Sequence, residues 1–135
     1  MADEKNNEEK YMQLQLLQQQ VEQITDYVEK LQMQRKELDT SIEALTELQK
    51  IKADTEIFAP IANGIFVKAE LKDNQKLLVN VGAEVAAEKT VAEVISLLEE
   101  QKGKIAENIA EAEGVLRELH EHGRRMYQET NEAVE

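Results

Sequence analysis

The chain of 135 residues has no cysteine, no tryptophan, one proline and only 4% aromatic residues. The absence of cysteine excludes a disulfide framework and a thiolate metal site. Few aromatic residues beside 33% charged residues argue against an ordinary globular core and are typical of long helices or a coiled coil. Because such helices bury only a stripe each, we expect a protein that is stable as an assembly of several chains.

Positive charge is also scarce, since 16 Lys and Arg stand against 28 Asp and Glu and give a net charge of −12. Phosphate binding needs a basic patch, so nucleic acid is not an expected partner. No apolar run approaches the length of a membrane span, and the opening segment MADEKNNEEK lacks the apolar centre of a signal peptide. We therefore expect a cytoplasmic protein that contacts no membrane.

The segment before residue 55 carries a heptad pattern. Ten positions follow alternating steps of three and four, and nine of them are apolar. They are Leu14, Leu17, Val21, Ile24, Val28, Leu31, Arg35, Leu38, Ile42 and Leu45, with Arg35 as the exception. A period of 3.5 predicts a helix that supercoils against a partner, here over residues 9–53, after a frayed tail of about eight residues.

The segment after residue 89 repeats the pattern less regularly. Thr90 followed by Glu93 is a capping box and predicts a helix over residues 90–132. Every seventh residue from Val91 to Ala133 is apolar, but Lys102, Gly123 and Thr130 fall in the second series of the seam. Three glycines, at 103, 114 and 123, each cost about 1 kcal/mol relative to Ala and predict a looser helix.

The two helices have equal predicted lengths of roughly 65 Å at 1.5 Å per residue. Equal length, with a short turn-back segment between them, predicts an antiparallel coiled coil within one chain. The terminal ends of both helices then meet at the end of the coil that lies furthest from residues 55–89.

Residues 55–89 read as two β-hairpins. Asn63-Gly64 predicts a type I′ turn between strands 57–62 and 65–71. Because Pro60 cannot donate a hydrogen bond, the first strand should lie at an edge, or the Pro60 nitrogen should point outward. Turns at 72–75 and at Gly82-Ala83 bound a third strand at 76–81 and a fourth at 85–88.

Apolar residues alternate with polar ones along these strands, so each strand has one apolar face. A small four-stranded sheet with no helix on that face has nothing in its own chain to cover it. Another copy or subunit must cover it, and the expected assembly residues are Ile57, Phe58, Ile65, Val67, Leu71, Leu77, Val79 and Val81.

The order of long coil, two hairpins and long coil resembles the prefoldin family, in particular its alpha class as found in archaea. The segments IFVKAEL at 65–71 and KLLVNVG at 76–82 are similar to the family's hairpins, and EKTV at 88–91 is similar to its entry into the second helix. Turn signals for two hairpins favour the alpha class, since beta-class subunits carry one.

The resemblance implies a single prefoldin-like subunit over residues 1–135. It implies a heterohexamer of two alpha and four beta subunits, whose hairpins form a β-barrel platform from which the coiled coils project. It also implies an ATP-independent chaperone (a holdase) that captures unfolded or nascent polypeptides at the coil tips and delivers them to a group II chaperonin.

Residues that could bind a metal, bind a phosphate or act in catalysis are not spaced as such sites require. His120 and His122 are two residues apart and face different sides of a helix, so they do not chelate one ion together. Gly103-Lys104 lacks the upstream glycine of a phosphate loop, and adjacent acidic pairs lie on exposed helix faces. We therefore expect no catalytic residue, no metal site, no cofactor and no enzyme activity.

The terminal ends of the two helices carry an unusual number of apolar residues. Leu14, Leu17, Leu119 and Met126 fit the heptad seam, so coil packing accounts for much of their role. Tyr11, Met12, Leu16 and Tyr127 fall off the seam and are expected to be exposed. Flexible Met and Leu side chains suit a surface that accepts many sequences, so these eight residues are the predicted client-binding set.

A second interpretation remains open. The same pattern is compatible with a structural coiled-coil spacer, or with a filament-forming subunit whose β segment polymerises. The two differ in what covers the apolar faces of the hairpins: another type of subunit in a closed complex, or further copies of this chain in an open stack.

Overall fold

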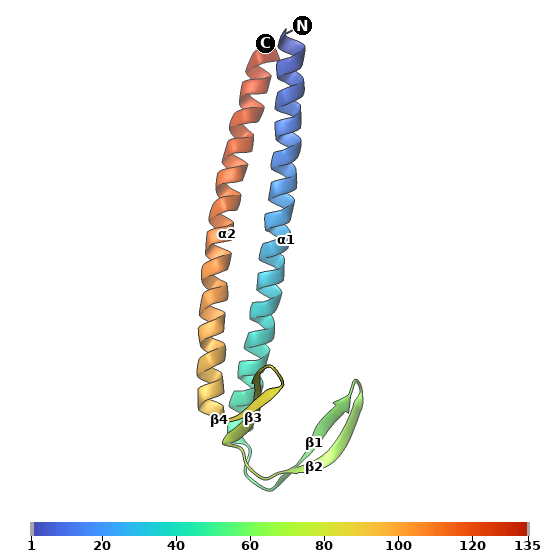
Figure 1. Cartoon of the computed structure of the whole chain (residues 1–135), viewed down its shortest axis with the longest axis vertical. Helices are drawn as coiled ribbons and strands as arrows, with labels where there is room; N and C mark the ends of the chain where they lie inside the picture. The colour runs from blue at the N-terminus through green and yellow to red at the C-terminus, as the bar shows by residue number, and fades with distance from the viewer. Residues whose placement is uncertain (1, 135) are drawn as a thin grey trace. The chain divides into compact units, whose positions relative to one another are not determined.

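A computed structural model describes the backbone of residues 2–134 and the side chains of residues 4–129. The element order is α1 (Ala2–Lys50), β1 (Thr55–Ala62), β2 (Ile65–Leu71), β3 (Lys76–Gly82), β4 (Val85–Thr90) and α2 (Val91–Val134) (Figure 1). The contacts divide the chain into two units, which we describe in turn. The helix-pair unit combines the part of α1 up to Arg35 with the part of α2 from Lys104, and the hairpin unit spans Lys36–Gly103.

The first helix differs from its sequence-based bounds, since α1 begins at Ala2 and ends at Lys50 instead of covering 9–53. The expectation of a frayed tail is wrong for the described residues. The residues before Leu14 lack the heptad pattern and so have no apolar seam, but they still form a helix, because Ala and Glu are strong helix formers. The acidic residue Glu4, in the first turn of α1, also interacts favourably with the positive end of the helix dipole.

Burial follows the heptad seam through both helices. All ten seam positions of α1 from Leu14 to Leu45 are buried or half-buried, and so is the three-four series of α2 from Val91 to Met126. The polar exceptions Arg35 and Lys102 are half-buried like their apolar neighbours. Within the hairpin unit, Lys102 Nζ of α2 lies 2.5 Å from Asp39 Oδ1 of α1, so this lysine of the seam has a charged partner on the other helix.

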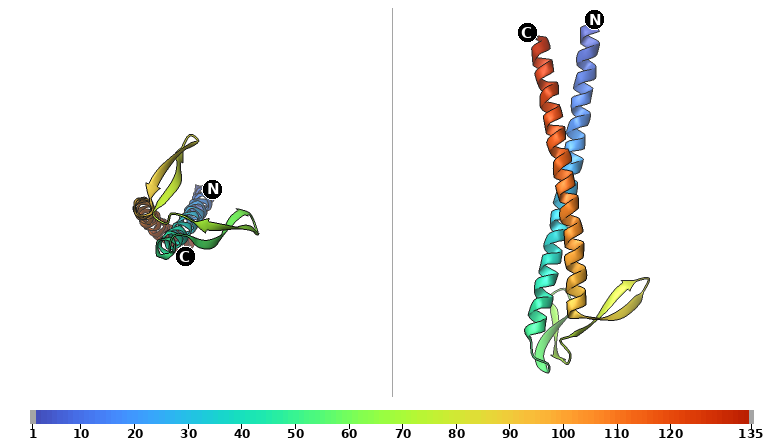
Figure 2. Two further views of the ribbon diagram at one scale, coloured as in Figure 1. Left: turned by 90° about the horizontal axis from the view of Figure 1, so that it is seen from below. Right: turned by 90° about the vertical axis from the view of Figure 1, so that its left-hand side faces the viewer.

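The helix-pair unit holds the core of that seam. Within it α1 and α2 run antiparallel (Figures 1 and 2). Val28 and Leu31 of α1 pack with Ile109 and Ala112 of α2 in a buried cluster. With Val91 of the hairpin unit, these are the five buried apolar residues among the described side chains. Burying one Val, Leu or Ile contributes only about 1.5–3 kcal/mol, so a single chain has little core of its own.

The hairpin unit contains two separate two-stranded sheets, β1–β2 and β3–β4, each antiparallel. The expectation of one four-stranded sheet is wrong, and Figure 2 shows two distinct ribbons. Each ladder is closed at its base by its own flanking residue. Asp54 N–H donates to the Leu71 carbonyl at 2.6 Å, and Val91 N–H donates to the Gln75 carbonyl at 2.8 Å.

Side chains complete the junctions between helices and hairpins. The Asn74 side-chain amide donates to the carbonyls of Gln49, at 3.3 Å, and Ile51, at 2.7 Å, and so caps the end of α1 from the β2–β3 turn. Thr90 Oγ1 accepts a hydrogen bond from the Glu93 N–H at 3.1 Å, which confirms Thr90 as the N-cap of α2.

The two hairpin turns reverse the expected assignment. A type I′ turn needs positive φ at both central residues, but only Gly64, at 78°, has it in the Asn63-Gly64 turn. The pair with positive φ is Ala83, at 49°, and Glu84, at 61°. The tight turn expected at Gly82-Ala83 therefore lies one residue further on, because Gly82 pairs with Val85 and leaves Ala83 and Glu84 to close the loop.

Candidate functional site

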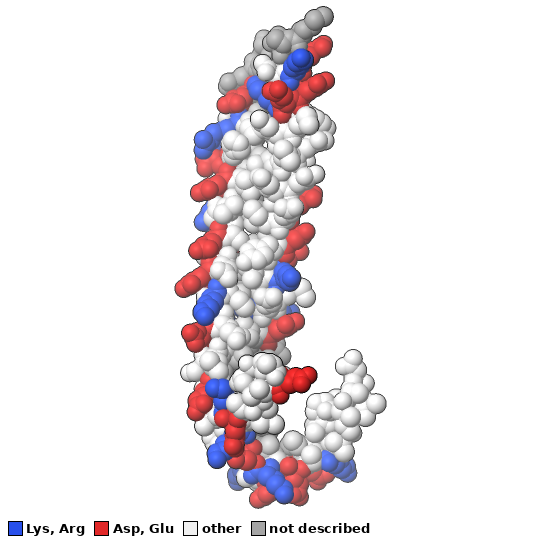
Figure 3. Space-filling model, viewed as in Figure 1, with Lys and Arg blue, Asp and Glu red and all other residues white. Residues whose placement is uncertain are grey.

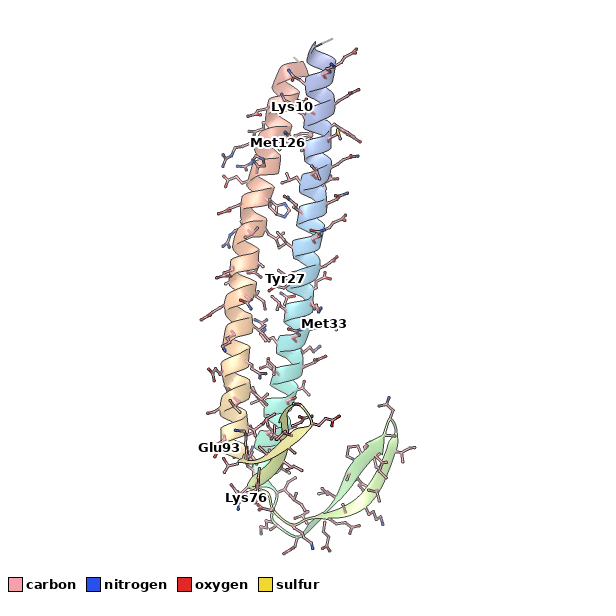
Figure 4. The ribbon with its side chains drawn as sticks, viewed as in Figure 1. Lys10, Tyr27, Met33, Lys76, Glu93 and Met126 are labelled. Carbon is pink, nitrogen blue, oxygen red and sulfur yellow. The ribbon has the colours of Figure 1, made fainter. Side chains whose placement is uncertain are left out.

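Four apolar side chains are exposed at the terminal end of the helix-pair unit. The exposed fractions are 64% for Tyr11, 64% for Met12, 59% for Leu16 and 62% for Tyr127. Leu14, Leu17, Leu119 and Met126 are half-buried in the seam beside them. We call these eight residues the tip. In Figure 4, Lys10 of α1 and Met126 of α2 mark this end of the unit.

Two grooves lie at the tip, and both include the seam residues Leu17 and Leu119. The tyrosine groove, of about 560 Å³, is lined by Leu14, Leu17, Gln18, Val21, Glu22, Leu119, His120, Gly123 and Tyr127. The glutamine groove, of about 430 Å³, is lined by Gln13, Leu16, Leu17, Gln20, Leu119, His122 and Met126. Six of the eight tip residues therefore line these grooves, while Tyr11 and Met12 are exposed outside both linings.

A close contact between the helices involves Leu17, which lines both grooves. A Cβ built on Gly123 would lie 2.8 Å from Leu17 Cδ2, which is too close for a side chain at its present position. Gly103 has nothing within 4 Å of such a Cβ, and Gly114 has only ordinary contact with Arg117. Gly123 therefore provides the space that Leu17 occupies, a role that the sequence-based view of loosening glycines missed.

Formal charge is absent from one side of the tip. Residues 11–21 of α1, YMQLQLLQQQV, contain no charged residue, although 33% of the chain is charged. Figure 3 shows a broad uncharged surface over this part of α1, between charged residues at its margins. The five glutamines of this stretch, at 13, 15, 18, 19 and 20, are all exposed.

The predicted assembly residues divide into two groups in the hairpins. Phe58, Ile65, Val67 and Val81 are exposed, while Ile57, Leu71, Leu77 and Val79 are half-buried. The apolar surface is larger than predicted, because Ile61, Phe66, Leu78 and Val85 are exposed as well. One-face alternation missed these four residues, although the uncharged run from Ile57 to Val67 is a signal that both faces of the outer part of the β1–β2 hairpin are apolar.

Neither a group of metal ligands nor a membrane-spanning helix is found among the described residues. His120 and His122 line different grooves, in agreement with their spacing. Among the described residues, no three His, Cys, Asp or Glu side chains are grouped so as to hold a metal ion. Neither helix has, in its described part, a stretch long and apolar enough to cross a membrane.

Comparison with known proteins assigns the fold to a family. The model of the Prefoldin family, described as prefoldin subunit, matches residues 17–135. A prefoldin subunit alpha from Archaeoglobus fulgidus is 28% identical over 96% of this chain and 94% of its own length. One from Pyrococcus horikoshii is 35% identical over 78% of this chain and 72% of its own.

A solved structure supports the same fold. The cryo-EM structure of filamentous prefoldin from Methanocaldococcus jannaschii matches with a TM-score of 0.75 at 19% identity, and covers 86% of this chain and 96% of its own. The family match covers the two hairpins, α2 and most of α1. This chain belongs to the prefoldin family of chaperones, as an alpha-type subunit that assembles with other prefoldin subunits.

Proposed function

We propose that this subunit captures unfolded or nascent polypeptides at its tip and delivers them to a group II chaperonin without using ATP. The observation that carries the proposal is the exposure of Tyr11, Met12, Leu16 and Tyr127 beside an uncharged helix face. Apolar side chains exposed together on a soluble surface mark interaction sites, and Met and Leu adapt to many partners. Because the prefoldin family is a family of chaperones, we propose that the subunit is not an enzyme.

The proposed complex contains two alpha and four beta subunits in the cytoplasm. Residues 55–89 form its assembly region, and the helices α1 and α2 form the projecting coil. Support comes from the exposed apolar residues of both hairpins and from their free strand edges, which invite pairing with another chain. The eight predicted assembly residues, joined by Ile61, Phe66, Leu78 and Val85, would contact neighbouring subunits.

Several tips acting together would explain capture by weak sites. Each tip exposes only four large apolar side chains, and one such contact is weak. Linking several weak sites around one client raises the overall affinity through effective concentration, by about 10²–10⁴. Release then requires only a partner that competes for the tips, so no nucleotide is needed.

The test replaces the exposed tip residues and measures suppression of client aggregation by light scattering. A quadruple variant, Tyr11→Gln, Met12→Gln, Leu16→Gln and Tyr127→Gln, removes apolar surface at positions where little packing is lost. The control, Tyr27→Gln with Met33→Gln, removes exposed apolar residues of the same unit away from the tip. We expect the quadruple variant to assemble normally and to lose suppression, while the control keeps it. Full suppression by the quadruple variant would show that the tip is not the binding site.

A second candidate is a filament subunit that assembles through its hairpins. It is favoured by the open edges of β1–β2 and β3–β4 and by the fold shared with a filamentous prefoldin. Native mass measurement of this chain, alone and with a beta-class subunit, separates the two. Long homopolymers without co-assembly would favour the filament, and a closed species of six chains would favour the chaperone complex.

A further inference from the structure

The glutamine groove differs from the other grooves described in this chain by its lack of charge. Its lining consists of glutamine, leucine, histidine and methionine. The tyrosine groove contains Glu22, a groove near Tyr27 contains Glu111, and a groove along the start of α2 contains Lys89, Glu93 and Glu100. A neutral lining is unexpected in a chain with a net charge of −12, which would repel acidic segments elsewhere on its surface.

The residues of the groove are arranged along one face of α1. Gln13, Leu16 and Gln20 follow steps of three and four, so the apolar side chain lies between two amides about 10 Å apart. Opposite them, α2 contributes His122 and Met126. A volume of about 430 Å³ is in the range of sites for small ligands, so it suits a few side chains and not a whole helix.

We propose, on the basis of the function proposed above, that the glutamine groove binds an extended apolar segment of an unfolded polypeptide whatever the charge of that segment. Leu16 and Met126 contact the apolar side chains of the client. The amides of Gln13 and Gln20 both donate and accept hydrogen bonds, so they fit a peptide main chain of either direction and favour neither sign of charge. The uncharged stretch 11–21 thus lets an acidic subunit accept acidic clients.

The experiment measures the binding of three fluorescent peptides to the assembled complex at 0.15 M salt. The peptides share one apolar centre and have neutral, lysine or aspartate flanks. The variant Gln13→Glu with Gln20→Glu places two carboxylates in the groove with almost no change of shape. The matched control, Gln15→Glu with Gln19→Glu, adds the same charge to exposed positions outside both tip grooves.

We expect the unaltered complex to bind the three peptides with Kd values within about threefold of one another. In the groove variant, the acidic peptide should bind about tenfold more weakly than the basic one, since charges several ångströms apart interact measurably near a protein surface. The control should stay within about threefold, because its carboxylates are exposed and outside the lining of both grooves, where solvent and salt screen their charge.

Equal discrimination by the groove variant and the control would overturn the inference. The inference would also be overturned if native mass measurement showed that the tips associate with one another and that the groove variant abolishes this association. A second copy of the chain would then be the occupant of the groove. The proposed function fails separately. If the quadruple tip variant binds all three peptides as tightly as the unaltered complex, the tip is not the client site at all.

Discussion

The contact between Gly123 and Leu17 makes a sharp prediction, because two other helix glycines lack such a contact. Replacing a helix-interior Gly by Ala stabilises a helix by about 1 kcal/mol when the new methyl group meets nothing. Gly103 meets that condition, so Gly103→Ala should raise the Tm by about 3–5 °C for a chain of this size. At Gly123 the new Cβ would lie 2.8 Å from Leu17 Cδ2, and Leu17 would have to move.

We therefore expect Gly123→Ala to leave the Tm unchanged or to lower it. Leu17 is half-buried in the seam, and its displacement offsets the gain in helix propensity. The double variant Leu17→Ala with Gly123→Ala removes the clash. In the Leu17→Ala background, Gly123→Ala should thus raise the Tm about as much as Gly103→Ala does, which corresponds to a coupling of about 1 kcal/mol.

The assay is thermal unfolding followed by circular dichroism at 222 nm. All variants are measured at one protein concentration, because association makes the Tm depend on concentration. If Gly123→Ala alone raises the Tm as much as Gly103→Ala, the helices do not approach closely at this position. If the effects of Leu17→Ala and Gly123→Ala on stability are additive in the double variant, the same reasoning is refuted.

Three further predictions concern the hairpin unit. Ala83→Asn with Glu84→Gly should stabilise the chain by about 1–2 kcal/mol, because both residues have positive φ, and an unchanged Tm would contradict a type I′ turn there. Asn74→Ala should lower the free energy of unfolding by about 1–3 kcal/mol, because two carbonyls near the end of α1 lose their donor. Thermal unfolding compares it with Asn80→Ala, which removes only a local hydrogen bond from Gly82 N–H and should have the smaller effect. Phe66→Asp with Leu78→Asp should prevent assembly, as seen by native mass, without lowering the helix content of the chain, and normal assembly would show that these exposed residues contact no neighbour.

The helix seam could be predicted from the sequence almost position by position. Steps of three and four place residues on one helix face whatever their chemistry, so even Arg35 and Lys102 are half-buried. The N-cap at Thr90 was also predictable, because it depends on local hydrogen bonding only.

The turns and the strand order could not be predicted in the same way. Turn type depends on which residues pair across the hairpin, and the register shifts between Pro60 and Ala62 and between Asn80 and Gly82 change that pairing. Both hairpins have the same shift just before the turn, yet Asn63-Gly64 has one positive φ, while Ala83 and Glu84 adopt two against their own preference. Whether β2 pairs with β3 is a tertiary question that alternation does not address.

The tip shows the same limit. Exposure of Tyr11, Met12, Leu16 and Tyr127 follows from their positions off the seam. The Leu17–Gly123 contact and the neutral lining of the glutamine groove depend on how α1 and α2 are aligned against each other. Pairing of one helix with another sets that alignment, and neither helix specifies it alone.

Site-specific photocrosslinking tests the central claim most directly. A photoreactive residue is placed at Met12, Leu16 or Met33 of the assembled complex, which is then irradiated with an unfolded client. Met33 is 66% exposed and Met12 is 64% exposed, so the two positions on α1 differ in place and not in accessibility. We predict client adducts at Met12 and Leu16 and few at Met33. Equal adducts at all three positions would contradict capture at the tip.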